Sequence, residues 1–153
     1  MITYRTLEFP ELSLGQLYRI LQLRSEVFVV EQTCVYQDID NKDSDAIHVI
    51  GLNEINEIHA YARILKPGVS YNEFSIGRVI VSSSHRRKKE GHRLMEVCMK
   101  YIETHAGKRS VRISAQAHLA SFYITHQFTS TGKEYLEDGI PHIEMIYIPK
   151  FTK

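Results

Sequence analysis

The stretch from Phe74 to Glu103 constrains the fold more than any other part of the chain. It begins with the apolar run FSIGRVIV, continues through the basic loop SSSHRRKKEG and ends in HRLMEVCMKYIE. An apolar run with so few polar residues is typical of a strand that is covered on both faces. From Leu94 onward the apolar residues recur at helical spacing, and Gly107 supplies a stop signal. The sequence therefore predicts a buried strand, a basic loop and a helix that begins near Glu90.

The start of that helix has the features of a phosphate-binding site. Its first turn would present free backbone N–H groups and the positive end of the helix dipole. The basic side chains around it are Arg86, Arg87, Lys88, Lys89 and Arg93. A solvated surface loop and a nucleic-acid site are the alternatives. Because the 153-residue chain has a net charge of only +1 and its basic loop lacks aromatic residues, nucleic acid is the least favoured of the three.

Three residues of the loop follow a known spacing. Arg86 is followed three positions later by Lys89 and two positions after that by Gly91. The arrangement resembles motif A of the GNAT acetyltransferases, which reads Arg or Gln, two residues, Gly, one residue, and Gly or Ala. Lys89 stands where the motif has its first glycine, at a point where bare backbone usually approaches the coenzyme A pyrophosphate.

A second match lies downstream, in the segment FYITHQF. Phe122, Tyr123 and Phe128 fit the Phe-Tyr-x-x-x-Gly-Phe with which the family ends a short helix, and Gln127 replaces the glycine. A glycine there would adopt the left-handed conformation, which glutamine reaches at a cost of about 1 kcal/mol. Two further segments, LRSEVFVVEQTCVYQDID and EDGIPHIEM, resemble the ElaA branch of the superfamily. With them, the similarity of the chain to this branch extends from Tyr4 to Ile148.

The resemblance implies a fold and an activity. The fold would be α/β, of the GNAT three-layer type, with a mixed central β-sheet flanked by helices. The activity would be that of an acetyl-CoA-dependent N-acyltransferase, which moves an acetyl group from coenzyme A to a primary amine by direct attack through a tetrahedral intermediate. The acceptor, a small-molecule or peptide amine, is not specified. A non-catalytic acyl-CoA-binding module is the alternative, because Ser75, Lys89 and Gln127 replace residues that the family prefers.

Acyl transfer from a thioester requires a neutral amine, a stabilised oxyanion and a stabilised thiolate. The resemblance places the pantetheine arm along the backbone of Val79, Ile80 and Val81, and the N–H of Val79 is the oxyanion candidate. Tyr123 would be the acid that faces the sulfur, with a pKa of about 10. The other residues expected to bind the coenzyme are Arg86, Arg87, Lys88, Lys89, Gly91 and His92.

The general base is left open. Some family members use a strand glutamate at the position that Ser75 occupies here, and Glu73 lies two residues earlier on the same face of the strand. Glu73 could act as a base through a water molecule. An ordered water alone is an equal alternative. Further acceptor-side candidates are Glu26, Glu31, His118 and His142.

Length and composition agree with one compact domain, and the resemblance implies that this is a single N-acetyltransferase domain over residues 1–153. Apolar residues make up 43% and charged residues 24%, which excludes long disorder, and no apolar run approaches the roughly 20 residues of a membrane span. Cys34 and Cys98 lie far apart, so neither a disulfide framework nor a metal site is expected. With no visible secretory signal, we expect a cytoplasmic protein that acts without a metal, a membrane or nucleic acid. A homodimer is compatible with the sequence.

The remaining segments predict regular elements around one acidic loop. Ser13 and Gln16 form a capping box for a helix with one apolar face, made of Leu14, Leu17, Tyr18 and Leu21. Strands are expected at 48–52 and 58–65, and a closing hairpin at 128–136 and 142–148. The stretch Asp38–Asp45 is expected to be a solvated loop, or else to attract a cationic amine. It is not an EF-hand, because Lys and Asp occupy positions that need an oxygen ligand and a glycine.

Overall fold

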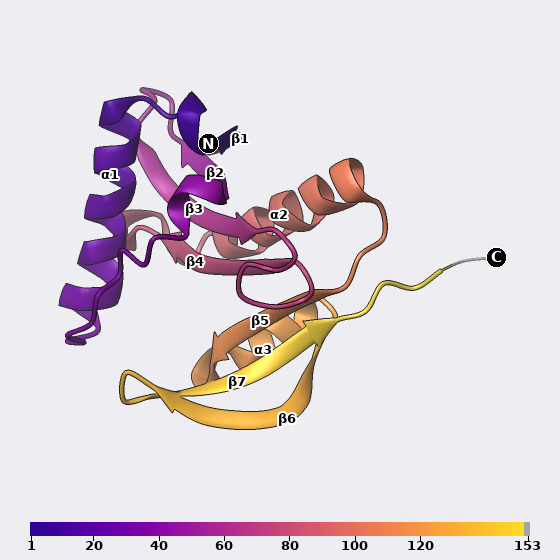
Figure 1. Cartoon of the computed structure of the whole chain (residues 1–153). Helices are drawn as coiled ribbons and strands as arrows, with labels where there is room; N and C mark the ends of the chain where they lie inside the picture. Colours follow the sequence, from indigo (N-terminus) through magenta and orange to yellow (C-terminus); the bar gives the residue numbers. More distant parts are fainter. Residues whose placement is uncertain (152–153) are drawn as a thin grey trace.

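The computed structural model describes residues 1–151. Figure 1 shows the elements in chain order. They are β1 (Thr3–Glu8), α1 (Leu14–Arg24), β2 (Ile47–Leu52), β3 (Ile58–Leu65), β4 (Ser75–Val81), α2 (Glu90–Ala106), β5 (Val111–Gln116), α3 (Ala120–Thr125), β6 (Phe128–Glu137) and β7 (Ile140–Tyr147). Wide π-helical turns at Ser25–Glu31 extend α1. None of these helices has the length and apolar character that crossing a membrane requires.

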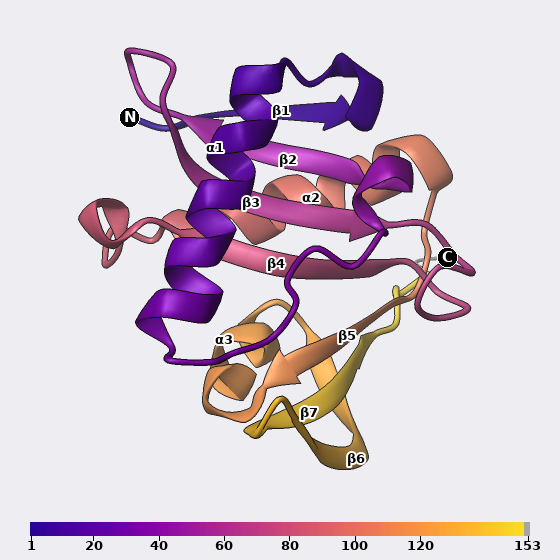
Figure 2. The same cartoon turned by 60° about the vertical axis from the view of Figure 1, so that its left-hand side comes forward.

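The strands form two antiparallel sheets. The first has the order β1-β2-β3-β4 and the second the order β5-β7-β6. In the described part of the chain, the sheets are joined by one parallel bridge between Phe74 and Val111, next to which the Arg112 N–H donates to the Phe74 carbonyl at 2.9 Å. Beyond this bridge β4 and β5 diverge (Figure 2). The α/β three-layer architecture is confirmed, and its sheet is divided at the predicted strand 74–81.

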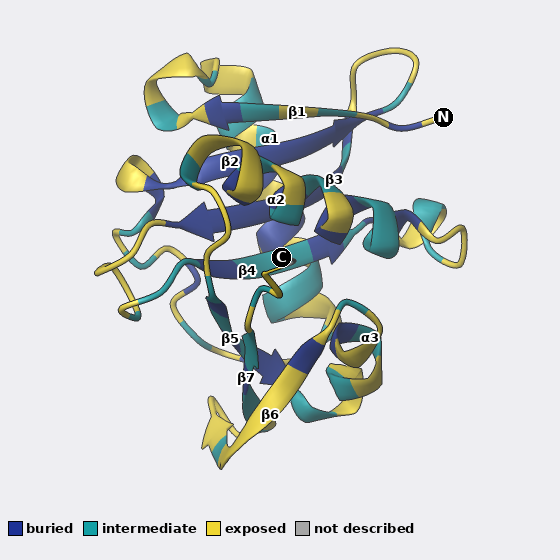
Figure 3. Ribbon diagram, turned by 90° about the vertical axis from the view of Figure 1, so that its right-hand side faces the viewer, coloured by how far each residue is buried: buried dark blue, intermediate teal, exposed yellow. Residues whose placement is uncertain are grey.

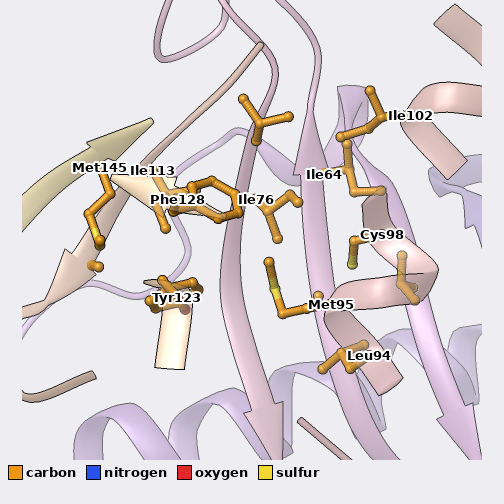
Figure 4. Close-up of a cluster of buried hydrophobic side chains, with 14 of the residues drawn as sticks. Ile64, Ile76, Leu94, Met95, Cys98, Ile102, Ile113, Tyr123, Phe128 and Met145 are labelled. Atoms are coloured by element: carbon orange, nitrogen blue, oxygen red, sulfur yellow. The ribbon is translucent and has the colours of Figure 1, made fainter. Parts of the chain in front are cut away.

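Helices α1 and α2 cover opposite faces of the first sheet (Figures 1 and 2). β2 and β3 are buried along nearly their whole length (Figure 3). On the α1 side the packed residues include Ile20, Leu23, Ile50, Tyr61 and Ile80. On the α2 side the cluster continues into the second sheet through Ile113, Phe128 and Met145, with Tyr123 at its edge (Figure 4). Two apolar layers thus hold β4 in place on either side.

The start of α1 is as predicted, but its inner face is not. Ser13 Oγ accepts from the Gln16 N–H at 3.1 Å, and Gln16 Oε1 accepts from the Ser13 N–H at 2.9 Å, which confirms the capping box. Of the predicted inner face, Leu17 and Leu21 are half-buried, but Leu14 and Tyr18 are 88% and 76% exposed, so that part of the prediction is wrong. The buried residues of α1 are Ile20, Leu23 and Arg24. A buried arginine interrupts this stripe, so the stripe does not stand out as apolar in the sequence.

The downstream elements agree with the sequence. α2 begins at Glu90 and ends before Gly107, which has a φ of +79°. Gln127 adopts the left-handed conformation that a glycine at this position would adopt more easily, with a φ of +69°. The hairpin between β6 and β7 turns at Asp138 and Gly139, both with positive φ, as in the turns that match the twist of paired strands.

The acidic stretch is a buried ion network, so the prediction of a solvated loop is wrong. Asp38 and Asp43 are only 9% and 8% exposed, and Arg24 is fully buried. The Arg24 guanidinium donates from Nε to Asp38 at 2.8 Å and from Nη1 to Asp43 at 2.7 Å. The network therefore ties the end of α1 to the segment before β2.

Two further arginines connect this segment to the sheet. Arg63 of β3 donates to both carboxylate oxygens of Asp40 at 2.8 Å and to Asp43 at 3.0 Å. Arg78 of β4 donates to Asp38 at 2.7 Å. Burial by itself would raise the pKa of the Asp40 and Asp43 carboxyls, but the hydrogen bonds and charges of the arginines lower both pKa values. Three arginines thus balance three aspartates.

The network gives a prediction for Arg24→Met. The substitution removes one of the two arginine partners of each of the buried carboxylates Asp38 and Asp43. The free energy of unfolding should therefore fall by about 3–5 kcal/mol at pH 7. Urea unfolding measures the loss. The control is Arg5→Met at an exposed position of β1, which should change stability by less than about 0.5 kcal/mol.

The pH dependence of this loss has a definite sign. The folded pKa values of Asp40 and Asp43 lie below the unfolded value of about 3.9. Their contribution is therefore complete above that value and disappears as the pH falls through the folded pKa values. The gap between wild type and Arg24→Met should be widest near neutrality and narrow below about pH 4. A gap that is the same at both pH values would contradict this description of the network.

Candidate active site

Two cavities meet where β4 and β5 diverge. The first, which we call the loop-side cavity, has a volume of about 950 Å³ and extends to the basic loop and the start of α2. The second, the hairpin-side cavity, has a volume of about 580 Å³ and extends to the β6–β7 turn. We call the residues that line both cavities the junction; they are Phe28, Gln32, Val79, Gln116, Leu119, Tyr123 and Ile140.

A bulge in β4 positions Val79 at the junction. Tyr61 pairs with Ile80, whereas Arg63 pairs with Gly77, so Arg78 and Val79 together face a single residue of β3. Arg78 has a φ of +52°, in the left-handed region. A bulge of this kind leaves one residue without its ladder partner and turns its backbone away from the strand. The Val79 backbone therefore lies where the sheet pairing is already interrupted.

The basic loop reaches α2 through left-handed residues. Arg87 and Lys89 have φ values of +64° and +62°, and Lys89 is the residue that precedes the first turn of α2. Lysine thus adopts the backbone conformation that the motif glycine would adopt more easily. A side chain at Gly91 would begin 3.4 Å from the Phe122 ring, so the backbone there passes close to α3.

The predicted coenzyme-binding residues gather around the loop-side cavity with one exception. Lys88 is exposed and does not line it. The residues that line it are Ile80, Val81, Arg86, Arg87, Lys89, Gly91 and His92, together with Val79 at the junction. His92 and His126 also share a hydrogen bond of 2.9 Å. Burial, with a smaller effect of His92, lowers the pKa of His126.

Arg86 is held by two partners inside the chain. Its Nε donates to the Val81 carbonyl at 2.9 Å, and its Nη2 donates to Glu31 Oε2 at 2.9 Å, with a second contact from Nη1. The hydrogen bond from Arg86 lowers the pKa of Glu31. Glu31, expected on the acceptor side, thus lies on the wall of the loop-side cavity and holds the basic loop.

The carboxylate in the first turn of α2 borders the loop-side cavity, but partners within the chain neutralise it. Glu90 accepts from the Tyr4 hydroxyl at 2.7 Å and from Arg93 at 2.7 Å. Burial and the contact with Glu90 together raise the pKa of Tyr4. Because Arg93 balances the charge of Glu90, the dipole of α2 and the basic loop set the potential at the helix start.

Tyr123 lines both cavities at the junction. It is 8% exposed, and its ring meets Phe122 and Phe128 edge-on, with ring centres 5.1 and 6.0 Å apart. Figure 4 shows it at the edge of the core cluster. Burial raises the pKa of Tyr123 to about 12. The phenol therefore stays protonated at physiological pH.

The glutamates considered as bases do not reach the junction. Glu73 accepts from Arg112 at 2.9 and 3.1 Å, and the two residues lie in a separate hollow with Glu144. The hydrogen bond from Arg112 lowers the pKa of Glu73. Glu26 is exposed, pairs with Arg19 at 3.7 Å and lines a different hollow. Neither carboxylate borders either of the two cavities.

The two histidines lie on opposite sides of the junction. His118 is exposed and lines the loop-side cavity. His142 is buried and lines the hairpin-side cavity, where its Nδ1 lies 2.7 Å from the Ile140 carbonyl and its Nε2 lies 3.2 Å from Glu137. Each therefore borders one cavity and not the other.

Two glutamines at the junction were not among the predicted site residues. Gln32 follows the π-helical turns, and Gln116 is the last residue of β5. Residues 111, 113 and 115 of β5 are buried, so the alternation of a strand directs Ser114 and Gln116 to the other face. Both line the hairpin-side cavity. This alternation was the available signal for Gln116, whereas Gln32 lies outside any strand and had none.

Comparison with known proteins gives one consistent result. A family model for the acetyltransferase (GNAT) domain matches residues 14–148. The chain is 46% identical over 147 residues to protein ElaA of Escherichia coli (strain K12), a match that covers 95% of each chain. The crystal structure of Escherichia coli ElaA is similar with a TM-score of 0.88 at 45% identity, covering 96% of this chain and 99% of that one.

Two further structures are similar over nearly the whole chain. An acyl-CoA N-acyltransferase from Pseudomonas aeruginosa has a TM-score of 0.89 at 39% identity and covers 96% of this chain and 99% of its own. An aminoglycoside 6′-N-acetyltransferase complexed with coenzyme A has a TM-score of 0.72 at 15% identity, with coverage of 97% and 99%. The second likeness concerns the fold alone.

Proposed function

The chain belongs to the GNAT acetyltransferase family, and we propose that it transfers an acetyl group from acetyl-CoA to a primary amine. It is an acyltransferase by this membership, and the proposal concerns the donor, the acceptor and the residues that act. The observation that carries it is that Val79 and Tyr123 line both cavities. A donor in one cavity and an acceptor in the other would meet at these two residues.

The loop-side cavity has the chemistry that coenzyme A needs. Its far end combines the start of α2 with Arg86, Arg87 and Lys89, a combination suited to a pyrophosphate. Within residues 1–151, the edge of β4 next to the cavity has no strand partner after the bridge at Phe74. This edge can therefore pair with the amides of the pantetheine arm. In this proposal the thioester reaches the junction and the acceptor enters through the hairpin-side cavity.

Two groups at the junction serve the reaction. The Val79 N–H stabilises the oxyanion of the tetrahedral intermediate. Tyr123 has a pKa of about 12, whereas an ordinary thiol titrates near about 8.5, so full proton transfer to the thiolate would be uphill by about 5 kcal/mol. Tyr123 therefore stabilises the departing sulfur as a hydrogen-bond donor, and solvent supplies the proton afterwards.

In this mechanism the amine arrives already neutral. Within residues 1–151, the polar side chains at the junction are Gln32, Gln116 and Tyr123, with no carboxylate or imidazole among them. Glu73 and Glu26 are engaged elsewhere. The proton that the amine loses after attack passes to water in the hairpin-side cavity. The protein then contributes orientation and charge stabilisation, and the acceptor's own pKa sets the fraction that reacts.

The alternative of a non-catalytic acyl-CoA-binding module is less well supported. It was motivated by Ser75 in place of a glutamate and by Lys89 and Gln127 in place of motif glycines. Lys89 and Gln127 nevertheless adopt positive φ values of +62° and +69°. The backbone geometry that the glycines would supply is therefore kept. Release of coenzyme A from acetyl-CoA, measured with amino acids, amino sugars, polyamines and peptide amides, tests for turnover. Saturable binding without amine-dependent release would support the binding module.

The proposed role of Tyr123 gives a prediction for Tyr123→Phe, which removes only the hydroxyl. The turnover rate should fall by about 10-fold to 100-fold, the usual effect of losing a hydrogen bond to a charged group. The KM for acetyl-CoA should change little. Tyr101→Phe on the outer part of α2, away from both cavities, is the control. Full activity in Tyr123→Phe would remove this residue from the mechanism.

The absence of a base gives a prediction for the pH dependence of kcat. Glycinamide and propylamine are suitable acceptors, because their amines titrate near about 8 and about 10.5. The rising limb of the pH profile of kcat should follow the pKa of the acceptor, so its midpoint should differ by about 2 pH units between the two amines. Activity should not decline near pH 10 through Tyr123, because its pKa is about 12. A rising limb at the same pH for both amines would reveal a base on the enzyme.

The contacts of Arg86 give a third prediction. Arg86→Gln should weaken coenzyme A binding, and the penalty should shrink at high salt. Glu31→Gln should free Arg86 and tighten binding by about twofold to fivefold, since exposed ion pairs are worth at most about 1 kcal/mol. Isothermal titration measures both, with Glu103→Gln at an exposed site on α2 as the control. Weaker binding in Glu31→Gln would mean that Glu31 orients Arg86 for the phosphates.

A further inference from the structure

A pair of side-chain amides lies across the junction of the two cavities. Gln116 Nε2 donates to Gln32 Oε1 at 3.2 Å, and Gln32 Nε2 donates to Gln116 Oε1 at 3.4 Å. The pair joins the segment after α1 to the end of β5, and both side chains are half-buried. Each carboxamide uses one N–H and one lone pair in this contact, so one N–H and one lone pair of each are free for a ligand.

The composition of the junction leaves few groups that could meet the acceptor amine. Apart from Tyr123, which the proposed function directs at the sulfur, the other side chains there are apolar: Phe28, Val79, Leu119 and Ile140. An attacking amine must place its N–H hydrogens against acceptors while its lone pair faces the thioester carbonyl. Within the described chain, the carboxamide oxygens of Gln32 and Gln116 are the side-chain acceptors at that point besides the phenol.

A carboxamide differs from a carboxylate in what it does to an amine. A carboxylate beside the nitrogen would stabilise the ammonium ion and raise its pKa, which lowers the fraction that can attack. A neutral carboxamide oxygen accepts an N–H hydrogen from the uncharged amine without favouring the ammonium ion in this way. An amide pair therefore suits an enzyme that has no base of its own at the point of attack.

We propose that Gln32 and Gln116 bind the acceptor amine and direct its lone pair at the thioester. This inference rests on the proposed function and names the acceptor class. Because nothing at the junction deprotonates the amine, acceptors with a pKa near 8, such as peptide-type α-amino groups, react in preference to polyamines or lysine side chains. At pH 7 about 10% of the former is neutral, against about 0.04% of the latter.

The pair can part without a change in the backbone. Its hydrogen bonds of 3.2 and 3.4 Å lie at or beyond the long end of the usual range, so exchanging them for contacts with an amine costs little. The backbone beside Gln32 is held on both sides. Glu31 contacts Arg86 of the basic loop, and Cys34 is buried. Rotation of the two side chains is enough to admit the ligand.

Nuclear magnetic resonance tests the contact directly. Glycinamide is titrated into the coenzyme A complex, where no transfer takes place, and the side-chain NH₂ signals of Gln32 and Gln116 are followed after assignment with the two Gln→Leu variants. Both signals should shift and saturate together. Gln22, an exposed glutamine of α1 outside both cavities, is the internal control and should not shift. Signals of Gln32 and Gln116 that stay unmoved by glycinamide would overturn the inference.

Kinetics with glycinamide separate a binding role from a structural one. Gln116→Leu should raise the KM for glycinamide about 10-fold and leave the affinity for acetyl-CoA unchanged. Gln116→Glu places a carboxylate beside the amine and raises the pKa of the bound amine. The rising limb of the pH profile of kcat should therefore move to higher pH by about one unit. Gln22→Glu should leave the limb in place. Unchanged pH profiles in all variants would contradict the proposal, because a merely structural glutamine would not move this limb.

Different results would contradict the proposed acetyl transfer and the proposed binding of the amine by Gln32 and Gln116. If the wild-type protein does not bind coenzyme A, the proposed function fails, and the titration of free protein with glycinamide still decides whether the two amides contact an amine. If coenzyme A binds and propylamine reacts faster at pH 7 than glycinamide, the proposed function stands and the assigned acceptor class is wrong. If glycinamide is preferred and the Gln signals shift, both hold.

Discussion

The parallel bridge between Phe74 and Val111 is the contact on which the rest of the structure depends. Strands pair to satisfy their backbone groups, and here pairing between the two sheets stops after one bridge. An unpaired strand edge inside a protein is costly unless something covers it. The divergence of β4 and β5 therefore creates both cavities at once, and it leaves the backbone of β4 available to a ligand with amides of its own.

Two devices keep the divided sheet in a fixed shape. On one face, the core around α2 continues into the second sheet, so the strands cannot close on each other or separate freely. On the other, Arg78 ties β4 to Asp38, and Arg24 ties the same aspartate to α1. A bulge with a left-handed residue would be costly in isolation. Here the left-handed residue is Arg78, and its ion pair with Asp38 holds the bulge in place.

The sequence predicted what depends on local patterns. The strand near Phe74, the helix that begins at Glu90 and the turn at Gly139 follow from periodicity and from stop signals, and their positions agree with the structure. Such features are fixed by neighbouring residues and can be deduced from them.

What the sequence did not predict depends on partners far along the chain. Asp38 looks like a loop residue until Arg24 and Arg78 are brought against it. The inner face of α1 was missed for the same reason, since Arg24 is polar in the sequence and buried in the fold. The pairing of Gln32 with Gln116 joins residues that share no local pattern. Long-range ion pairs and amide contacts leave no periodicity to detect.

The most direct test of the central claim is amide hydrogen exchange along β4. The exchange rates of the amides from Gly77 to Val81 would be measured with and without acetyl-CoA. If the acyl-pantetheine arm lies along the unpaired edge of β4, exchange at Val79 should become slower on binding, while exchange along the exposed strand β6 should not change. Tight binding of acetyl-CoA with no change at Val79 would contradict the claim that the divided sheet holds the thioester.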